Sequence, residues 1–420
     1  MAVSATLAIN QLTAERLAAG RPVLPLGFGE AGLPVHPDLV AALRVAAASG
    51  SSGGYGPVTG LPALREAAAG YWRRRCLPTT AGQVIAGPGS KPLLYAVLRA
   101  SVGGVALPRP SWVTYAAQAQ LLGREVHHVP TLDGQGGVPD PDLLDAAAAS
   151  ASAAGRPIGL VVLTLPDNPT GTLAGSGTIR SVADVARRHD LLIVSDEIYR
   201  DLVHDPVREF LSPAELAPER TVVTTGLSKN LALGGWRIGV ARMPEGPLGD
   251  RLGAEVAAVA SEVWSSPANP VQQAAAWAFE EPEQLTERIA ASRSLHARVA
   301  GAVADRFAAA GASVHPPTAA FYLYPDFSAY ADLLAERWSV RTGTELANLL
   351  LDSFDVATLP GAAFGDPDER LSLRIATSML YGEGEQREKA LTAADPVELP
   401  WVADRLDQLS AALGRLFDRG

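Results

Sequence analysis

The feature that most constrains the fold is an alternation that runs through the middle of the chain. Short runs of β-branched and aliphatic residues alternate with longer Ala-rich stretches in which apolar residues recur at helical spacing. This pattern is typical of βαβ units built around a parallel sheet. We therefore predict an α/β fold with a mostly parallel central sheet flanked by helices. The four clearest strand-like runs cover residues 102–107, 158–165, 191–195 and 222–225.

The chain changes character after about residue 280. Residues 285–311 have the periodicity of one long amphipathic helix, and short strand-like segments follow it. The first part of the chain contains a helical stretch and a Gly/Pro-rich loop, and we expect it to join the C-terminal part. The expected units are an N-terminal segment over residues 1–45, a large domain over residues 46–285 and a small α+β domain over residues 286–420.

The charge of the chain argues against several classes of partner. The formal net charge is −10, and no basic run of five or more residues interrupts it. Such a surface repels nucleic acid and anionic membranes. The cluster Arg73, Arg74 and Arg75 is interpreted as a solvated helix face rather than a binding patch. No stretch of about 18 uninterrupted apolar residues occurs, and the amino terminus lacks a basic segment followed by an apolar run, so we expect neither membrane insertion nor secretion.

Cysteine usage gives a further constraint. Cys76 is the only cysteine in the sequence, which excludes an intrachain disulfide and leaves no thiolate cluster for a metal. We predict no metal site. Sparse cysteines suit a reducing compartment, so we expect a cytoplasmic location.

The residues with chemical potential lie just after the predicted strands. Lys229 follows the run at 222–225, and burial there lowers the pKa of an amine, so that its neutral form can attack an aldehyde. Asp196 and Tyr199 follow the run at 191–195. A carboxylate can pair with a protonated pyridine nitrogen, and a phenol can hydrogen-bond the 3'-oxygen of that ring. Taken alone, Lys229 also suits a surface lysine, and Asp196 also suits a helix cap.

Two loops could complete a binding site. Asn168 lies in the turn Asp-Asn-Pro-Thr-Gly directly after the run at 158–165, where its amide could reach the same 3'-oxygen or serve only in a turn. The sequence Gly89-Ser90-Lys91 precedes a helical run and is similar to an anion cradle, in which backbone N–H groups approach a phosphate at a helix amino end. Arg237 could supply a cation to that phosphate. A Gly-rich turn before a helix is also common for structural reasons alone.

Taken together, these motifs resemble the class I/II aminotransferase family, which has the fold-type-I architecture of aspartate aminotransferase. The resemblance extends over most of the chain. It rests on Tyr55, Gly60, Leu64-Arg65, Gly89-Ser90-Lys91, Trp112, Asn168-Pro169-Thr170-Gly171, Asp196-Glu197-Ile198-Tyr199, Ser228-Lys229 and Gly235-Trp236-Arg237-Ile238-Gly239, in that order. It implies a pyridoxal 5'-phosphate (PLP) enzyme in which Lys229 forms a Schiff base with the cofactor and later moves the proton between Cα and C4'.

The resemblance also implies a role for each position. Asp196 would hold the ring nitrogen, Asn168 and Tyr199 the 3'-oxygen, and Trp112 would stack on the ring, although a core tryptophan is an equal interpretation. Tyr55 would reach the phosphate of a neighbouring subunit, which implies a homodimer with shared active sites. The remaining cofactor-binding positions are Gly89, Ser90, Lys91, Ser228 and Arg237.

Substrate recognition is implied less directly. Arg374 is our candidate for the clamp on the substrate carboxylate, with Arg370 as a competitor, and Gly29 and Asn168 complete the substrate-binding set. Lys91 stands where a subgroup of aspartate and prephenate aminotransferases has a lysine for the distal carboxylate, although a solvated lysine at a helix start suits the position equally. After Gly29 the family's usual acidic and aromatic continuation is replaced by Ala31-Gly32-Leu33.

Transamination between an amino acid and a 2-oxo acid is the leading hypothesis. The alternative keeps the cofactor but diverts the carbanion to elimination, replacement or ring closure, as in aminocyclopropane-carboxylate synthase. The altered loop after Gly29 and the segment at residues 317–325 would suit a specialised substrate. A third hypothesis, a regulator that borrowed the fold, lacks the basic DNA-binding segment that such regulators carry.

Overall fold

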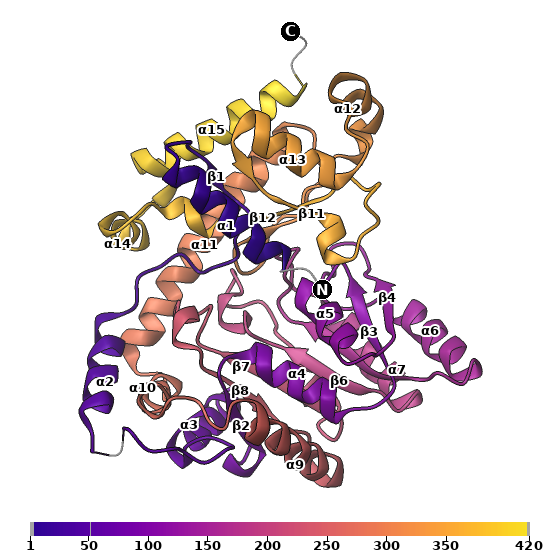
Figure 1. The fold of residues 1–420 in the computed structure, drawn as a ribbon, viewed down its shortest axis with the longest axis vertical. Coiled ribbons are helices and arrows are strands. Elements are labelled where there is room, and N and C mark those ends of the chain that lie inside the picture. Colours follow the sequence, from indigo (N-terminus) through magenta and orange to yellow (C-terminus); the bar gives the residue numbers. More distant parts are fainter. Residues whose placement is uncertain (1–3, 51, 418–420) are drawn as a thin grey trace.

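The computed structural model describes residues 4–50 and 52–417 and is centred on a seven-stranded sheet (Figure 1). The strand order is β2-β8-β7-β6-β5-β3-β4, and only β8 runs antiparallel to its neighbours. The predicted α/β fold with a mostly parallel sheet is therefore confirmed. The strands are β2 (Val84–Gly87), β3 (Gly104–Arg109), β4 (Val126–Pro130), β5 (Ile158–Thr164), β6 (Leu192–Asp196), β7 (Thr221–Gly226) and β8 (Gly239–Arg242).

Helices cover both faces of this sheet. On β5, Leu160 and Val162 belong to a core formed with α4, α5 and α9, whereas Val161 and Leu163 belong to a core formed with α6, α7 and α8. Because both faces are buried, the strands are continuous apolar runs and do not alternate with polar residues. The helices around the sheet are α3 (Pro62–Arg73), α4 (Ser90–Ala100), α5 (Val113–Leu121), α6 (Pro141–Ala153), α7 (Ser176–Arg188), α8 (Pro213–Leu216), α9 (Gly246–Val263) and α10 (Asn269–Phe279).

The four predicted runs correspond to β3, β5, β6 and β7. Strands β2, β4 and β8 were not predicted. Strands β2 and β8 have only four residues each, and the edge strand β4 contains the partly exposed His127 and the exposed His128. Short or edge strands bury less apolar surface, so their sequence pattern is weaker.

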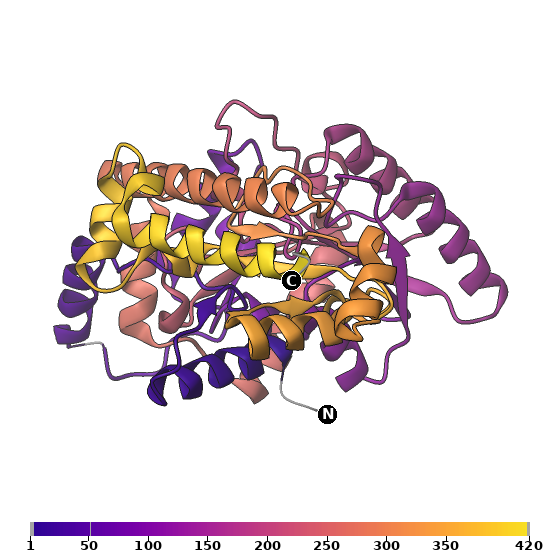
Figure 2. The same cartoon turned by 90° about the horizontal axis from the view of Figure 1, so that it is seen from above.

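A second core joins the two ends of the chain. Leu24, Leu26 and Leu33 pack with buried residues between Leu295 and Leu416. The long α11 runs alongside α15, as Figure 2 shows. The elements are α1 (Ala5–Ala18), α2 (Pro37–Ala48), α11 (Glu283–Ala309), α12 (Ala331–Trp338), α13 (Gly343–Phe354), α14 (Glu385–Thr392) and α15 (Pro400–Phe417), with strands β1 (Leu24–Pro25), β9 (Tyr322–Leu323), β10 (Val356–Ala357), β11 (Leu359–Pro360) and β12 (Leu373–Ala376).

Strand pairing in this part of the structure joins segments that are distant in sequence. Strand β1 pairs in parallel with β10, and β12 lies between β11 and β9 in an antiparallel sheet. Short 3-10 helices occur at η1 (Ala81–Gln83), η2 (Arg200–Leu202), η3 (Gly234–Trp236), η4 (Ser328–Tyr330), η5 (Gly361–Phe364), η6 (Ser378–Tyr381) and η7 (Pro396–Glu398). Within the described ranges, no helix is long and apolar enough to span a membrane.

The interpretation of the arginine cluster as a solvated helix face is wrong for Arg75. Helix α3 ends at Arg73, so Arg75 leaves the exposed face and turns inward. Its guanidinium lies 2.9 Å from Asp201 and also pairs with Glu281, and it stacks 3.6 Å from the centre of the Tyr71 ring. The side chain is 19% exposed. Arg75 is therefore part of a partly buried ion-pair network.

Candidate active site

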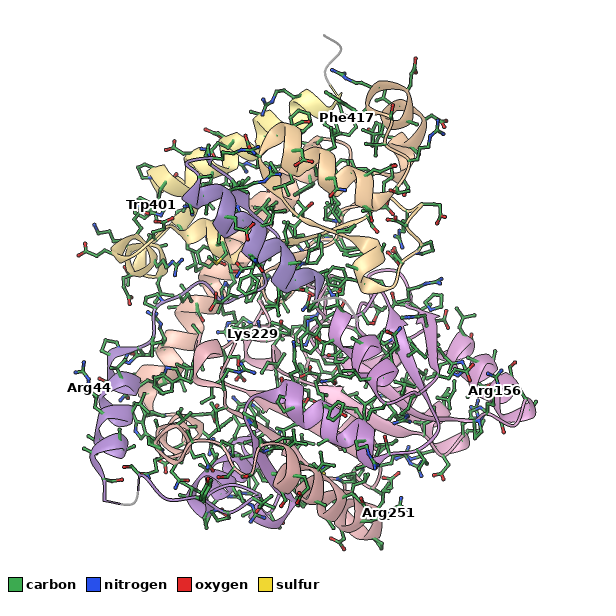
Figure 3. All side chains as sticks on the ribbon, viewed as in Figure 1. Arg44, Arg156, Lys229, Arg251, Trp401 and Phe417 are labelled. Atoms are coloured by element: carbon green, nitrogen blue, oxygen red, sulfur yellow. The ribbon has the colours of Figure 1, made fainter. Side chains whose placement is uncertain are left out.

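The carboxyl ends of the central strands face a cavity of about 560 Å³ that the C-terminal part of the chain closes from the other side. In Figure 3, Lys229 lies at this junction, whereas Arg44, Arg156 and Arg251 lie at the periphery. Every site residue predicted from the sequence lines the cavity except Gly89 and Tyr55. The predicted residues that line it are Gly29, Ser90, Lys91, Trp112, Asn168, Asp196, Tyr199, Ser228, Lys229, Arg237 and Arg374.

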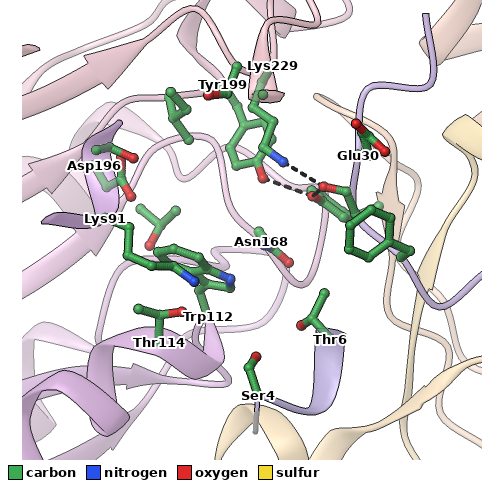
Figure 4. A pocket seen from close by; sticks show the side chains of 18 of the residues that line it. Ser4, Thr6, Glu30, Lys91, Trp112, Thr114, Asn168, Asp196, Tyr199 and Lys229 are labelled. Carbon is green, nitrogen blue, oxygen red and sulfur yellow. Dashed lines mark hydrogen bonds between the residues drawn. The ribbon is translucent and has the colours of Figure 1, made fainter. Parts of the chain in front are cut away.

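Lys229 lies in the loop after β7 and points into the cavity (Figure 4). Its Nζ donates a hydrogen bond of 2.6 Å to the carbonyl oxygen of Gly29. Burial, together with the nearby positive charge of Arg374, lowers the pKa of the amine to about 8. A substantial fraction of Lys229 is therefore neutral near physiological pH, which is the nucleophilic form.

Asp196 is the last residue of β6 and is almost fully buried. It accepts hydrogen bonds from the hydroxyls of Tyr115 at 2.9 Å and Thr224 at 3.1 Å. Burial raises the pKa of the carboxyl to about 6, although these donors oppose the rise. No lysine, arginine or histidine in the described part of the chain forms an ion pair with it. A cationic ring nitrogen in the cavity would therefore find an uncompensated carboxylate.

Asn168 and Tyr199 present polar groups on the same wall. Asn168 follows β5, is 5% exposed, and its Oδ1 has no hydrogen-bond partner within residues 4–50 and 52–417. The hydroxyl of Tyr199 lies 2.9 Å from that of Tyr322. Because buried polar atoms are normally hydrogen-bonded, the free Asn168 oxygen marks a position where a ligand atom belongs.

The amino end of α4 forms an anion cradle. Gly89 adopts a φ of 98°, and a Cβ there would collide with the guanidinium of Arg237. Arg237 is held by the carbonyl oxygens of Gly234 at 2.7 Å and Pro88 at 3.2 Å, and its cation faces the helix start at Ser90. No acidic residue lies in the first turn of α4. The free N–H groups, the helix dipole and the arginine together favour a phosphate.

Trp112 borders the cavity, with the Nζ of Lys91 5.1 Å from its ring centre. Figure 4 shows these two side chains together, across from Asp196. Burial lowers the pKa of Lys91, and the charge of Arg237 lowers it further. No carboxylate of the described residues pairs with this amine.

The geometry separates the two arginine candidates. Arg374 lines the cavity, is 1% exposed, and its Nη2 donates to the carbonyl oxygen of Gly27, while Nε has no described partner. Arg370 lies outside this cavity and pairs with Asp326 at 2.7 Å and Asp366 at 3.5 Å. Of the two guanidiniums, only that of Arg374 is therefore available to a ligand in the cavity.

Two predicted residues do not line the cavity, and several residues that line it were not predicted. Gly89 does not line the cavity but supports Arg237, and Tyr55 is 95% exposed and lies away from Lys229. Sequence reasoning missed Tyr115, which bonds Asp196, and Tyr322, which bonds Tyr199. Tyr115 comes soon after Trp112 and could have been noticed by that proximity. The other lining residues not predicted are Ser4, Thr6, Leu7, Phe28, Glu30, Thr114, Thr164, Ile198, Gly234 and Gly235.

Among the described residues, no three or more His, Cys, Asp or Glu side chains are grouped so that they could hold a metal ion. The cavity instead combines a desolvated amine, a buried carboxylate and an anion cradle. These are the groups that a phosphorylated, aldehyde-bearing pyridine ring requires.

Comparison with known proteins agrees with this chemistry. Residues 21–383 match the family model "Aminotransferase class I and II". The chain is 32% identical over 384 residues to an aspartate aminotransferase of Geobacillus stearothermophilus, covering 90% of this chain and 92% of that protein. It is 31% identical to an aspartate/prephenate aminotransferase of Thermus thermophilus, covering 90% and 93%.

The fold agrees as well. The solved structure of the Thermus thermophilus aspartate aminotransferase with maleate superimposes with a TM-score of 0.82 at 28% identity, covering 98% of this chain and 97% of that one. The chain therefore belongs to the class I and II aminotransferases, and it is an aminotransferase that depends on pyridoxal 5'-phosphate.

Proposed function

We propose that this aminotransferase takes the amino group from an acidic amino acid such as aspartate and passes it to a 2-oxo acid. The observation that carries the choice of substrate is Lys91. Its partly desolvated ammonium lines the cavity with no described carboxylate partner, and a second cation, Arg374, lines the same cavity. A dicarboxylic substrate would satisfy both cations. The relatives named above act on aspartate or prephenate by their names.

The residues present fit the cofactor. The side-chain amide of Asn168, whose Nδ2 can donate to an oxygen of the ring, the uncompensated carboxylate of Asp196 and the cradle of Gly89 and Arg237 are three separate features that suit a bound PLP. PLP supplies an aldehyde that condenses with amines and a ring that accepts the electron pair left at Cα. Asp196 would face its ring nitrogen, and Asn168 and Tyr199 its 3'-oxygen. The phosphate would be held by Gly89, Ser90, Ser228 and Arg237, which leaves the amine of Lys91 for the substrate.

Each of the side chains around the cavity has a separate role in the proposed reaction. Lys229 carries the cofactor and, as a neutral amine with a pKa of about 8, removes the proton from Cα of the substrate and returns it at C4'. Asp196 stays ionised once a cation faces it, because the opposite charge lowers its pKa. Arg374 binds the α-carboxylate with two N–H groups and so directs Cα toward Lys229. The ring of Trp112 limits movement of the cofactor plane.

Three further statements about the protein belong to the proposal. The exposure of Tyr55 in a single chain supports a homodimer in which this tyrosine enters the partner's site. The second core supports a small domain of residues 286–420 joined by residues 1–45, with a large domain over residues 46–285. The single cysteine supports a cytoplasmic location.

The test is a half-reaction screen with purified holoenzyme. Aspartate and glutamate should convert the bound cofactor to pyridoxamine phosphate at least about tenfold faster than alanine or leucine, since a hydrogen bond to a charged group such as Lys91 contributes about 1.5–3 kcal/mol. Lys91→Met should remove this preference and leave turnover of alanine unchanged, whereas Lys389→Met serves as the matched control. Equal rates for all amino acids would refute the substrate assignment. Ammonia or olefinic products would instead favour elimination, which the altered loop after Gly29 would suit.

A further inference from the structure

Tyr322 is a wall residue of the active-site cavity to which the sequence motifs assign no role. It lies on β9 and is 1% exposed. In the small antiparallel sheet it pairs with Ala376 on β12, the strand that also holds Arg374. The guanidinium of Arg374 lies 5.2 Å from the centre of the Tyr322 ring. Tyr322 is therefore built into the side of the cavity that carries the carboxylate clamp.

The hydroxyl of Tyr322 reaches the other side of the site. It lies 2.9 Å from the hydroxyl of Tyr199, and the two rings meet edge to face with centres 5.5 Å apart. The same hydroxyl is 3.3 Å from the carbonyl oxygen of Gly29, which also accepts the 2.6 Å hydrogen bond from Lys229. The hydroxyl of Tyr322 thus contacts Tyr199 itself and the carbonyl oxygen that accepts the hydrogen bond from Lys229.

The Asn-Pro-Thr-Gly turn holds Tyr322 in place. Gly171 adopts a φ of 70°, and a Cβ there would collide with the backbone carbonyl of Tyr322. The amides of Thr318 and Ala319 donate to the carbonyl oxygen of Gly171 at 2.9 and 3.0 Å. The turn that supplies Asn168 therefore also determines the position of Tyr322. The close approach of the Tyr322 carbonyl is therefore a second reason, besides the turn conformation, why position 171 requires a glycine.

Hydrogen counting decides what the phenol pair can do. Each hydroxyl carries one hydrogen. If Tyr322 donates to Gly29, Tyr199 must donate to Tyr322 and has none left for a ligand. If Tyr322 donates to Tyr199, the hydrogen of Tyr199 is free to point into the cavity. The 2.9 Å contact is within the normal range for such a bond, whereas 3.3 Å is long, so the geometry favours the second arrangement.

We propose that Tyr322 is a positioning residue whose hydroxyl donates to Tyr199 and thereby directs the Tyr199 hydrogen toward the 3'-oxygen of the cofactor. The inference rests on the proposed function, in which Tyr199 contacts that oxygen. A hydroxyl that accepts one hydrogen bond becomes a stronger donor of the next. Tyr322 therefore strengthens the contact between Tyr199 and the cofactor without touching the reacting atoms.

The test is Tyr322→Phe, which keeps the ring and its packing and removes only the hydroxyl. In the holoenzyme without substrate, the midpoint of the pH titration of the cofactor's absorbance should rise by about half a pH unit to one pH unit, because the 3'-oxygen loses part of its donor. The kcat should fall about threefold to tenfold, whereas KM for the amino acid should change less than about twofold, since Arg374 is unchanged. Tyr324→Phe is the matched control, because Tyr324 bonds Asp366 outside the cavity.

A double-mutant cycle with Tyr199→Phe separates this inference from the proposed function. If Tyr322 acts through Tyr199, Tyr322→Phe should shift the titration in the parent protein and have no effect in the Tyr199→Phe background. A shift for Tyr199→Phe but none for Tyr322→Phe overturns the inference and leaves the proposed function in place. No shift for either variant overturns the proposed contact of Tyr199 itself. A loss of thermal stability without a shift in the titration would mean a structural role only and also overturns the inference.

Discussion

The desolvated amine of Lys229 leads to a prediction that can be measured without substrate. Burial, with the neighbouring charge of Arg374, lowers its pKa from 10.5 to about 8, and this gap corresponds to about 3 kcal/mol against the charged form. At pH 7.5 about a quarter of the amines should be neutral, compared with about one in a thousand for an ordinary lysine. Protein freed of cofactor should therefore recombine with PLP about 200 times faster than an unperturbed amine would allow.

The chain is well suited to a direct assay, because its sequence contains only three lysines, Lys91, Lys229 and Lys389. Reductive methylation with ¹³C-formaldehyde labels them, and Lys229→Ala assigns the signal of interest. In the cofactor-free protein the Lys229 resonance should titrate near pH 8. Arg374→Leu should raise that midpoint by removing a neighbouring positive charge, whereas Arg370→Leu, outside the cavity, should leave it unchanged.

The same pKa has a consequence for stability. Because the folded-state pKa is depressed, the unfolded chain binds the proton first as the pH falls, so the cofactor-free protein loses stability between about pH 10.5 and pH 8. The wild type should therefore lose up to about 3 kcal/mol relative to Lys229→Met over this interval, measured by urea unfolding at a series of pH values. A Lys229 midpoint at or above about pH 10, together with no change in relative stability, would refute the reasoning from burial.

Three further predictions concern the supports of the site. Gly89→Ala places a Cβ at a positive φ against a neighbouring guanidinium, so affinity for PLP should fall about tenfold or more in an equilibrium titration; Gly177→Ala, which meets open space, should leave it unchanged. Arg75→Met leaves two partly buried carboxylates without their shared cation and should lower the free energy of unfolding by about 2 kcal/mol, whereas Arg156→Met at an exposed pair should cost less than about 1 kcal/mol. Asp196→Asn should slow the single-turnover half-reaction by about a hundredfold or more with a native circular dichroism spectrum, because a neutral amide cannot hold a positive charge on the cofactor ring; an unchanged rate would contradict that role.

Much of the site could be predicted because its residues are close in sequence to the strand ends. Asn168, Asp196 and Lys229 each follow a buried apolar run within a few positions. In a parallel sheet the carboxyl ends of adjacent strands meet at one edge, so three local patterns predict one shared location. The order of the motifs along the chain is also a property of the sequence alone, and it indicates the family.

Other parts of the site depend on contacts that local patterns do not encode. Arg374 and Arg370 lie in similar short sequences, yet Arg374 lines the cavity and Arg370 is neutralised by two aspartates outside it. Successive residues of a strand point to opposite faces, so two even-numbered arginines on one strand would share a face. Strand alternation alone therefore does not distinguish Arg370 from Arg374. The difference arises because Arg370 precedes the strand, which begins at Leu373. Knowing where a short strand starts requires its pairing partners.

The amino-acid sequence by itself determined the α/β class, the cofactor and most of the predicted residues that line the cavity, because strand periodicity and loop motifs are local properties of the chain. Only the tertiary structure decided which cation remains free for the substrate, that Arg75 turns inward to an ion-pair network, and that Tyr322 connects Tyr199 to Gly29 across 123 and 293 residues of sequence. Pairs so distant in sequence meet only after the two ends of the chain pack into one core. Their hydrogen bonds and charges follow from that packing, and no short segment of the sequence contains both partners.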